Sequence, residues 1–266
     1  MLSLVASRHA KKFTQQAVTV DLLKEKLSDF EASIARARKA AEPVKFVWYP
    51  YGSLSNVVHL DRLLGGKLRD LSRLAQDKPV ADIGAADGDF GFLLEQLGLT
   101  VDIIDYAATN SSHLEGARTL KRQLKSKIKI YDIDLDSQFA LPRRDYGLVI
   151  FLGILYHLKN PFYAMERLAM HADYCLVSTR IAQFSPDSKQ NWSKSALAYL
   201  VGARELNNDP TNFWVFTEVG LKRLFDRAGW EVAAYMTAGD TVASTPSSME
   251  HDERAFALLR SKRRAT

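Results

Sequence analysis

The stretch ADIGAADGDF, residues 81–90, decides how this chain folds. An acidic residue lies near the end of a short apolar run, glycines follow at Gly84 and Gly88, and a helical pattern begins at Phe90. Glycine lets the backbone turn tightly and approach a ligand closely, so this arrangement is typical of a strand–loop–helix unit that binds a nucleotide. Because a glycine-rich loop is a weak signal by itself, the residues around it must support this interpretation.

Strand and helix patterns alternate along the chain from Pro79 onward. The apolar runs of strand type are residues 80–83, 101–104, 128–133, 146–152, 174–178, 230–236 and 254–259. The helical patterns among them are residues 90–97, 111–124, 161–170 and 218–228. Such alternation predicts a Rossmann-like α/β fold, with a mostly parallel sheet, an antiparallel last strand and helices on both faces.

The residues before the loop predict a helical arm. Apolar residues recur three and four apart from Val18 to Ala41, which indicates an amphipathic helix, and the apolar start Met1–Ala6 is expected to begin a helix too. The aromatic run at residues 45–51 contains Pro50 and predicts a loop. A second helix is expected from about Asn56 to Leu74.

These patterns predict two regions. Residues 1–75 would form an N-terminal helical arm with its aromatic loop, and residues 76–266 would form the cofactor-binding domain. A polar stretch at about residues 181–213 is expected to be an insertion after a strand, where an open α/β sheet builds its substrate site. A short helical pattern at residues 193–205 lies inside it.

Composition and net charge limit the partners and the cellular location that we expect for this chain. Its 266 residues carry a net charge of +5, which permits a nucleic-acid partner without requiring one. The single cysteine, Cys175, excludes an internal disulfide framework and favours a reducing, cytoplasmic location. No apolar stretch has the length of a membrane span, no metal site is expected, and a homo-oligomer is considered.

The acidic residues around the loop decide between two nucleotide cofactors. Asp105 ends the second strand about twenty residues after the loop, where a carboxylate accepts the hydroxyls of a ribose. A dinucleotide fingerprint has a glycine where this chain has Ala86, and the Asp82 carboxylate would repel a pyrophosphate. The same carboxylate attracts the ammonium and sulfonium of S-adenosylmethionine (SAM), so we expect SAM.

The pattern Asp82-x-Gly84-x-Ala86-x-Gly88 resembles the first motif of the class I SAM-dependent methyltransferases. The resemblance implies further cofactor contacts at the ends of the next strands. An acidic residue after the third strand would lie near the adenine, and we prefer Asp132, with Ile133 beside it, over Asp134. The other cofactor contacts that it implies are Tyr106, after Asp105, and Leu152, on the methionine side of the pocket.

A second resemblance is narrower. GILYHLKNP at residues 153–161 and NFWVFT at residues 212–217 resemble blocks of the tRNA wobble-uridine carboxymethyltransferase family and its methyltransferase relatives. In that family a tyrosine and an arginine grip the carboxylate of carboxy-SAM, which implies this role for Tyr156 and Arg254. Leu60 stands where that family has tryptophan. We therefore expect plain SAM rather than carboxy-SAM, and methyl rather than carboxymethyl transfer.

The same blocks supply the candidate catalytic and substrate residues. His157, with Tyr156 beside it, is the candidate general base, needed only if the acceptor must lose a proton. The alternative is that both residues only pack and form hydrogen bonds at the end of a strand. The candidate substrate-binding residues are Tyr51, Arg180, Trp214 and Arg254.

Three functions follow from these residues. The first is a SAM-dependent methyltransferase that acts on a small molecule or a glycan precursor. The second is a tRNA-modifying (carboxy)methyltransferase that acts on a wobble uridine, and a helical arm with a broad positive face would favour it. The third is a SAM- or nucleotide-binding protein without transfer activity.

Overall fold

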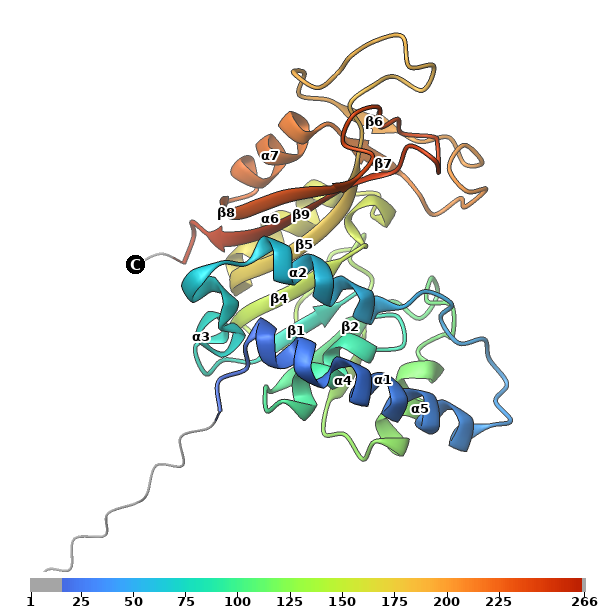
Figure 1. The fold of residues 1–266 in the computed structure, drawn as a ribbon, viewed down its shortest axis with the longest axis vertical. Coiled ribbons are helices and arrows are strands. Elements are labelled where there is room, and N and C mark those ends of the chain that lie inside the picture. The colour runs from blue at the N-terminus through green and yellow to red at the C-terminus, as the bar shows by residue number, and fades with distance from the viewer. Residues whose placement is uncertain (1–15, 265–266) are drawn as a thin grey trace, which may run out of the picture.

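The computed structural model describes residues 16–264, and the apolar start at Met1–Ala6 lies outside them. One mixed sheet forms the centre of the molecule (Figure 1). Five of its strands are parallel and follow the order β3-β2-β1-β4-β5. Their bounds are β1 Val80–Ile83, β2 Val101–Asp105, β3 Lys129–Asp132, β4 Tyr146–Leu152 and β5 Ala172–Ile181.

The last strand of the chain runs against its neighbours. β9, Glu253–Ser261, lies between β5 and β8, Trp230–Gly239, and is antiparallel to both. Two short strands, β6 at Ala198–Leu200 and β7 at Trp214–Phe216, extend the sheet from the end of β5. The predicted Rossmann-like sheet with an antiparallel last strand is thereby confirmed.

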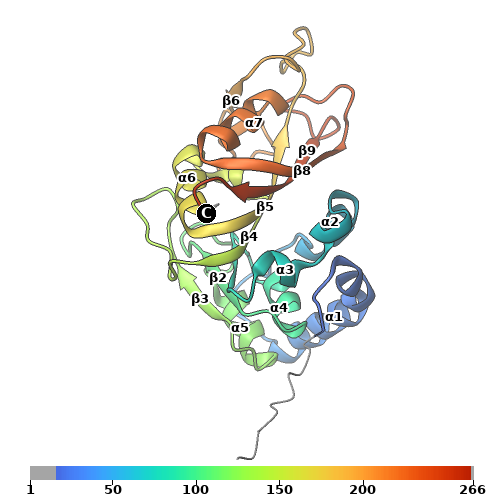
Figure 2. The ribbon, with the colours of Figure 1, turned by 90° about the vertical axis from the view of Figure 1, so that its left-hand side faces the viewer.

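Helices cover both faces of the sheet (Figure 2). Their ends follow the usual chemistry of helix capping: the Thr19 hydroxyl accepts from Leu22 N at 3.2 Å where α1 begins, and the Thr217 hydroxyl accepts from Gly220 N at 3.1 Å where α7 begins. Pro161 opens α6, where a missing N–H does no harm. The bounds are α1 Val20–Ala41, α2 Asn56–Leu63, α3 Leu71–Ala75, α4 Asp89–Gln96, α5 Glu115–Gln123, α6 Pro161–His171 and α7 Glu218–Arg227, with short 3₁₀ turns η1 Ser53–Ser55, η2 Gly66–Arg69 and η3 Leu155–His157.

The buried side chains form one large cluster on each face of the sheet. On one face, the apolar stripe of α1 (Leu23 and Phe30) and Leu60 of α2 pack with Ile103 of β2 and Leu258 of β9. The opposite cluster is built from the other sides of the strands with α6 and α7. The N-terminal helices therefore share a core with the sheet, and their amphipathic pattern is explained by it.

Two sequence predictions were wrong. The helix expected over Asn56–Leu74 ends at Leu63, because Leu64 and Gly65 are extended, and Gly66, with φ of +53°, then begins η2 before α3. The helical pattern at residues 193–205 forms no helix and contains the edge strand β6, whose pairing with β7 overrides the local pattern. β7 itself was missed because three residues are too few for a periodicity to show. No helix in residues 16–264 is long and apolar enough to cross a membrane.

Candidate functional site

The loop between β1 and α4 has a left-handed backbone conformation at three positions, and two of these are glycines. Gly84, Ala86 and Gly88 have φ of +67°, +54° and +86°, in the left-handed region. A Cβ added at Gly84 would lie 2.4 Å from Ile154 Cδ1, so only glycine fits beneath this side chain. The loop therefore holds its backbone close against the end of β4, and a nucleotide-binding loop needs such a close approach.

Acidic residues gather beside this loop at the carboxyl ends of β2 and β3. Asp105 Oδ2 accepts from Ala86 N at 2.9 Å, and its Oδ1 accepts from Tyr106 N at 2.7 Å. Burial raises the pKa of Asp105, although these hydrogen bonds oppose the rise. Asp132 lies opposite Asp105 in the sheet register, and Ile133 N donates to the Asp105 carbonyl at 2.9 Å.

Asp82 differs from these two carboxylates because it is enclosed. Its side chain is 4% exposed, and its Oδ2 has no hydrogen-bond partner among the described residues. Burial raises its pKa to about 7, and the nearby backbone N–H of Gly91 opposes the rise. A nearby positive charge would stabilise the ionised form, so this carboxylate would favour the binding of a cationic ligand at the loop.

Asp87, for which the sequence predicts no role, joins three parts of the chain. Its Oδ2 accepts from Tyr49 N at 2.7 Å, and its Oδ1 accepts from Ser112 Oγ at 3.0 Å. Arg38 of α1 lies 3.5 Å from Asp87 and forms an ion pair with Asp89 at 3.0 Å. Asp87 thus connects the aromatic segment and the N-terminal helix to the loop between β1 and α4, which we call the cofactor loop. These residues lie far apart in the sequence, so no spacing pattern predicts their contacts.

The aromatic segment brings Tyr49 to the edge of the site. Burial raises the pKa of Tyr49 to about 12, and the charges that add to or oppose this rise include Tyr156, Arg254 and Asp105. The charges that affect the pKa of Tyr49 thus belong to η3, to β9 and to the end of β2. Tyr51, a predicted substrate residue, packs edge-on against Tyr49 with ring centroids 5.4 Å apart and is 72% exposed.

The two candidate catalytic residues lie side by side on η3. The rings of Tyr156 and His157 have centroids 4.2 Å apart. His157 Nδ1 lies 3.0 Å from the Thr211 carbonyl oxygen and 3.0 Å from Thr211 Oγ1, and Thr211 Oγ1 donates to Asp209 Oδ1 at 2.6 Å. Burial lowers the pKa of His157. The polar insertion thus orients the imidazole, since both Thr211 and Asp209 belong to it.

Two arginines meet at the end of the sheet. Arg180 of β5 and Arg254 of β9 are directly opposite in the antiparallel register. Arg180 is 2% exposed, forms an ion pair with Asp252 at 3.0 Å and donates to the Thr245 and Ser248 carbonyls. The Arg254 guanidinium lies 5.6 Å from the Tyr156 ring centroid. Of the predicted substrate residues, Arg254 faces the site, whereas Arg180 holds the β8–β9 loop.

The remaining predicted residues lie around these groups. Trp214 donates from Nε1 to the Lys159 carbonyl at 3.3 Å, next to η3. Leu152, at the end of β4, packs with the core cluster that includes α1. The residues at the ends of β1 and β2 fit SAM in their chemistry: Gly84 allows a close backbone approach, Asp105 is a carboxylate that could accept hydroxyl groups, and Asp82 is an enclosed carboxylate that a cation would stabilise.

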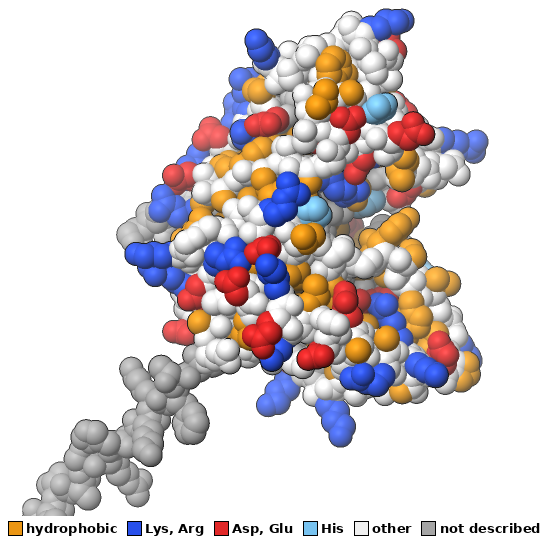
Figure 3. All heavy atoms as spheres, in the orientation of Figure 1, with side chains coloured by type: hydrophobic (Ala, Val, Ile, Leu, Met, Phe, Trp, Pro, Cys, Tyr) orange, Lys and Arg blue, Asp and Glu red, His pale blue; other side chains and the backbone are white. Residues whose placement is uncertain are grey.

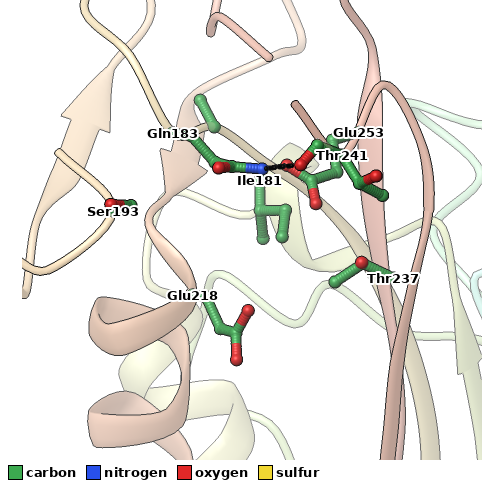
Figure 4. A pocket seen from close by; sticks show the side chains of 8 residues that line it. Ile181, Gln183, Ser193, Glu218, Thr237, Thr241 and Glu253 are labelled. Carbon is green, nitrogen blue, oxygen red and sulfur yellow. Dashed lines mark hydrogen bonds between the residues drawn. The ribbon is translucent and has the colours of Figure 1, made fainter. Parts of the chain in front are cut away.

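A separate cavity of about 250 Å³ lies on the α7 side of the sheet (Figure 4). It is lined by Glu218 of α7, Thr237 of β8 and Glu253 of β9, among others. Glu253 Oε2 already accepts from Gln183 Nε2 at 2.9 Å and from Ser244 Oγ at 2.5 Å. Glu253 and Arg254 are successive on their strand and point to opposite faces, so this cavity is distinct from the site at Arg254.

Comparison with known proteins gives a family and a fold. Residues 58–235 match the family model described as a methyltransferase domain. No curated protein sequence matches the chain significantly. Among solved structures, the N-terminal domain of EvdMO1 with SAH bound is similar at 15% identity and a TM-score of 0.54, over 87% of this chain and 96% of that chain.

Two further solved structures are similar at the same level. The 1,6-didemethyltoxoflavin-N1-methyltransferase of Burkholderia thailandensis, with its bound 1,6-didemethyltoxoflavin and S-adenosylhomocysteine, matches at 14% identity and a TM-score of 0.52, over 92% of this chain and 91% of that chain. A putative methyltransferase from Bacillus halodurans C-125 matches at 12% identity and a TM-score of 0.52, over 72% of this chain and 98% of that chain. These similarities show the fold.

Proposed function

Because this chain belongs to the methyltransferase-domain family and is a class I SAM-dependent methyltransferase, we propose that it methylates a small molecule at the site between Tyr49, Tyr156, His157 and Arg254. The observation that carries the proposal is the cluster of Tyr156, His157 and Arg254, with ring centroids 4.2 Å apart and the guanidinium 5.6 Å from the Tyr156 ring, while the Tyr49 backbone is bound to Asp87 of the loop between β1 and α4. A planar acceptor suits such aromatic walls, because it can stack on them.

In this proposal the cofactor is held by the residues that the sequence analysis singled out. Asp105 binds the ribose, Asp132 and Ile133 lie beside the adenine, and the loop from Gly84 to Gly88 lies against the rest. Bound SAM supplies a methyl group that is already activated, so the enzyme mainly has to align the acceptor with it. Tyr49 and Tyr156 provide surfaces for this alignment.

His157 acts in the proposal as the base that takes a proton from the acceptor. A carbonyl oxygen can only accept a hydrogen bond, so the hydrogen facing the Thr211 carbonyl must be on Nδ1. Nε2 then carries a lone pair. Because burial lowers the pKa of His157, the imidazole is neutral near pH 7 and is able to accept the proton.

A small acceptor is favoured over tRNA by the surface of the N-terminal helix. We expected an RNA-modifying enzyme to have a broad positive face on this arm. α1 carries five basic and four acidic residues: Asp21, Glu25, Asp29 and Glu31 lie with Lys24 and Lys26 toward its start, and Arg36, Arg38 and Lys39 follow toward its end, where Arg38 pairs with Asp89. Figure 3 shows acidic and basic side chains intermixed over α1 and α2. Such a mixed face attracts a nucleic-acid backbone weakly.

The second candidate remains a tRNA wobble-uridine (carboxy)methyltransferase. The proximity of Arg254 to Tyr156 supports it, because the resemblance assigns this pair to the carboxylate of carboxy-SAM. Mass spectrometry of the nucleoside that copurifies with the protein distinguishes the two cofactors. Carboxy-SAM in that sample would favour the second candidate, and SAM or its demethylated product would favour the first.

Transfer of radiolabel from [methyl-³H]SAM tests the acceptor class. The full chain is incubated separately with the small-molecule fraction and the tRNA fraction of a cell extract. We expect label in the small-molecule fraction alone, and Asp105→Asn serves as the cofactor-binding control. Label confined to tRNA would overturn the small-molecule proposal, and tight SAH binding without any transfer would favour a binding protein.

Three other expectations from the sequence also stay proposals. They are the boundary at residue 75 between the helical arm and the cofactor-binding domain, the homo-oligomer and the cytoplasmic location.

A further inference from the structure

Positive charge exceeds negative charge where β5 ends and β9 begins. Asp252 is shared by two guanidinium groups: its Oδ1 lies 3.0 Å from Arg180 Nη1, and its Oδ2 accepts from Arg254 Nε at 3.2 Å. Two guanidinium charges against one carboxylate leave one positive charge. Arginine stays protonated under all ordinary conditions, so this excess is permanent.

Only one of the two arginines can meet a ligand. Arg180 is buried and is engaged by Asp252 and by two carbonyl oxygens of the β8–β9 loop. The side chain of Arg254, by contrast, is 38% exposed. Its positive charge also acts to lower the pKa of Tyr49, His59 and His157, which belong to three different segments of the chain. Arg254 is therefore the charged group at the centre of the proposed acceptor site.

The neighbouring titratable groups do not neutralise this charge. Burial is the main cause that lowers the pKa of both His59 and His157, so both imidazoles are neutral near pH 7. The His59 ring stacks on Phe256, two residues along β9 from Arg254, with ring centroids 4.3 Å apart. His59 and Tyr156 thus give Arg254 flat aromatic neighbours and no second anion.

We propose that the acceptor carries a carboxylate group, which Arg254 binds while the aromatic side chains hold the body of the molecule. This inference rests on the proposed methyl-transfer function and names its substrate class, an aromatic or heteroaromatic carboxylate. A guanidinium presents parallel N–H groups that match a carboxylate in shape and charge. A monoanion matches the single excess charge, whereas a phosphate monoester would bring more negative charge than the site can balance.

The pair benzoate and benzamide tests this inference, because the two have the same size and differ in charge. Calorimetry measures their affinity for the full chain saturated with SAH. We expect benzoate to bind about tenfold more tightly than benzamide, as one charge-assisted contact provides. Arg254→Gln should abolish this preference, and Arg254→Lys should retain part of it. Equal binding of the two probes by the unaltered chain would overturn the inference.

Arg260→Gln is the matched control, because Arg260 lies on the same strand but is paired with Glu231 on the surface. It should leave the preference for benzoate unchanged, and an equal loss in both variants would show a general effect of charge and overturn the inference. SAH affinity is measured in each variant. If Arg254→Gln weakens SAH binding as much as benzoate binding, Arg254 serves the cofactor and the inference fails. If the unaltered chain binds no SAH, the proposed function itself fails.

Discussion

Replacing Asp82 by asparagine tests the electrostatics of the cofactor loop. Burial raises the pKa of this carboxyl from 3.8 to about 7. A carboxyl whose pKa is higher in the folded chain than in the unfolded chain destabilises the fold as pH rises from the lower value to the higher, because the unfolded chain releases the proton first. The penalty is about 1.6 kcal/mol near pH 5 and about 4 kcal/mol near pH 8, at about 1.4 kcal/mol for each pKa unit.

Asparagine has nearly the same shape and no charge, so Asp82→Asn avoids this penalty. We expect the free energy of unfolding of the variant, relative to that of the unaltered protein, to increase by about 2–3 kcal/mol as the pH is raised from 5 to 8. Urea unfolding of both proteins without cofactor measures the difference. Asp226→Asn is the control: Lys262 lowers the pKa of the exposed Asp226, so this group is ionised at both values. If the stability difference for Asp82→Asn is the same at both pH values, the account of its burial is wrong.

The other predictions concern the same loop and its support. Asp105→Asn should weaken SAH binding at least about tenfold by calorimetry, and unchanged affinity would show that the ribose position is misassigned. Gly84→Ala places a Cβ 2.4 Å from Ile154 at φ of +67°, so it should lose about 2–4 kcal/mol in urea unfolding. Gly153→Ala, with its nearest atom at 3.9 Å, should lose only the roughly 1–2 kcal/mol of the left-handed conformation. Arg38→Leu leaves buried carboxylates unpaired and should destabilise the fold by about 2–4 kcal/mol, and an unchanged unfolding midpoint would contradict this.

The fold was predictable from the sequence because its signals are local. Each buried parallel strand is a short apolar run, and the glycines at positions 84 and 88 mark the turn between β1 and α4. The position of Asp105 at the end of β2 was predictable for the same reason, and its role at the ribose stays a prediction. Local signals failed where tertiary contacts decide, as in the stretch at residues 193–205, which becomes an edge strand through pairing with β7.

The candidate site was only partly predictable, because its parts come from distant segments. Tyr156 and Arg254 were singled out by resemblance, and the structure brings them within 5.6 Å of each other. The carboxylate of Asp87, however, links Tyr49 to the cofactor loop across 38 residues of sequence. A hydrogen bond to a backbone N–H leaves no trace in residue types. Such links become visible only in three dimensions.

The packing of α1 and α2 into the sheet has a practical consequence. Leu23, Phe30 and Leu60 cover Ile103 and its neighbours on one face of the sheet. A shortened chain that starts after these helices would expose this apolar surface to water and would tend to aggregate during expression. The helices α1 and α2 are therefore an integral part of the folded domain, and a shortened chain should keep both of them.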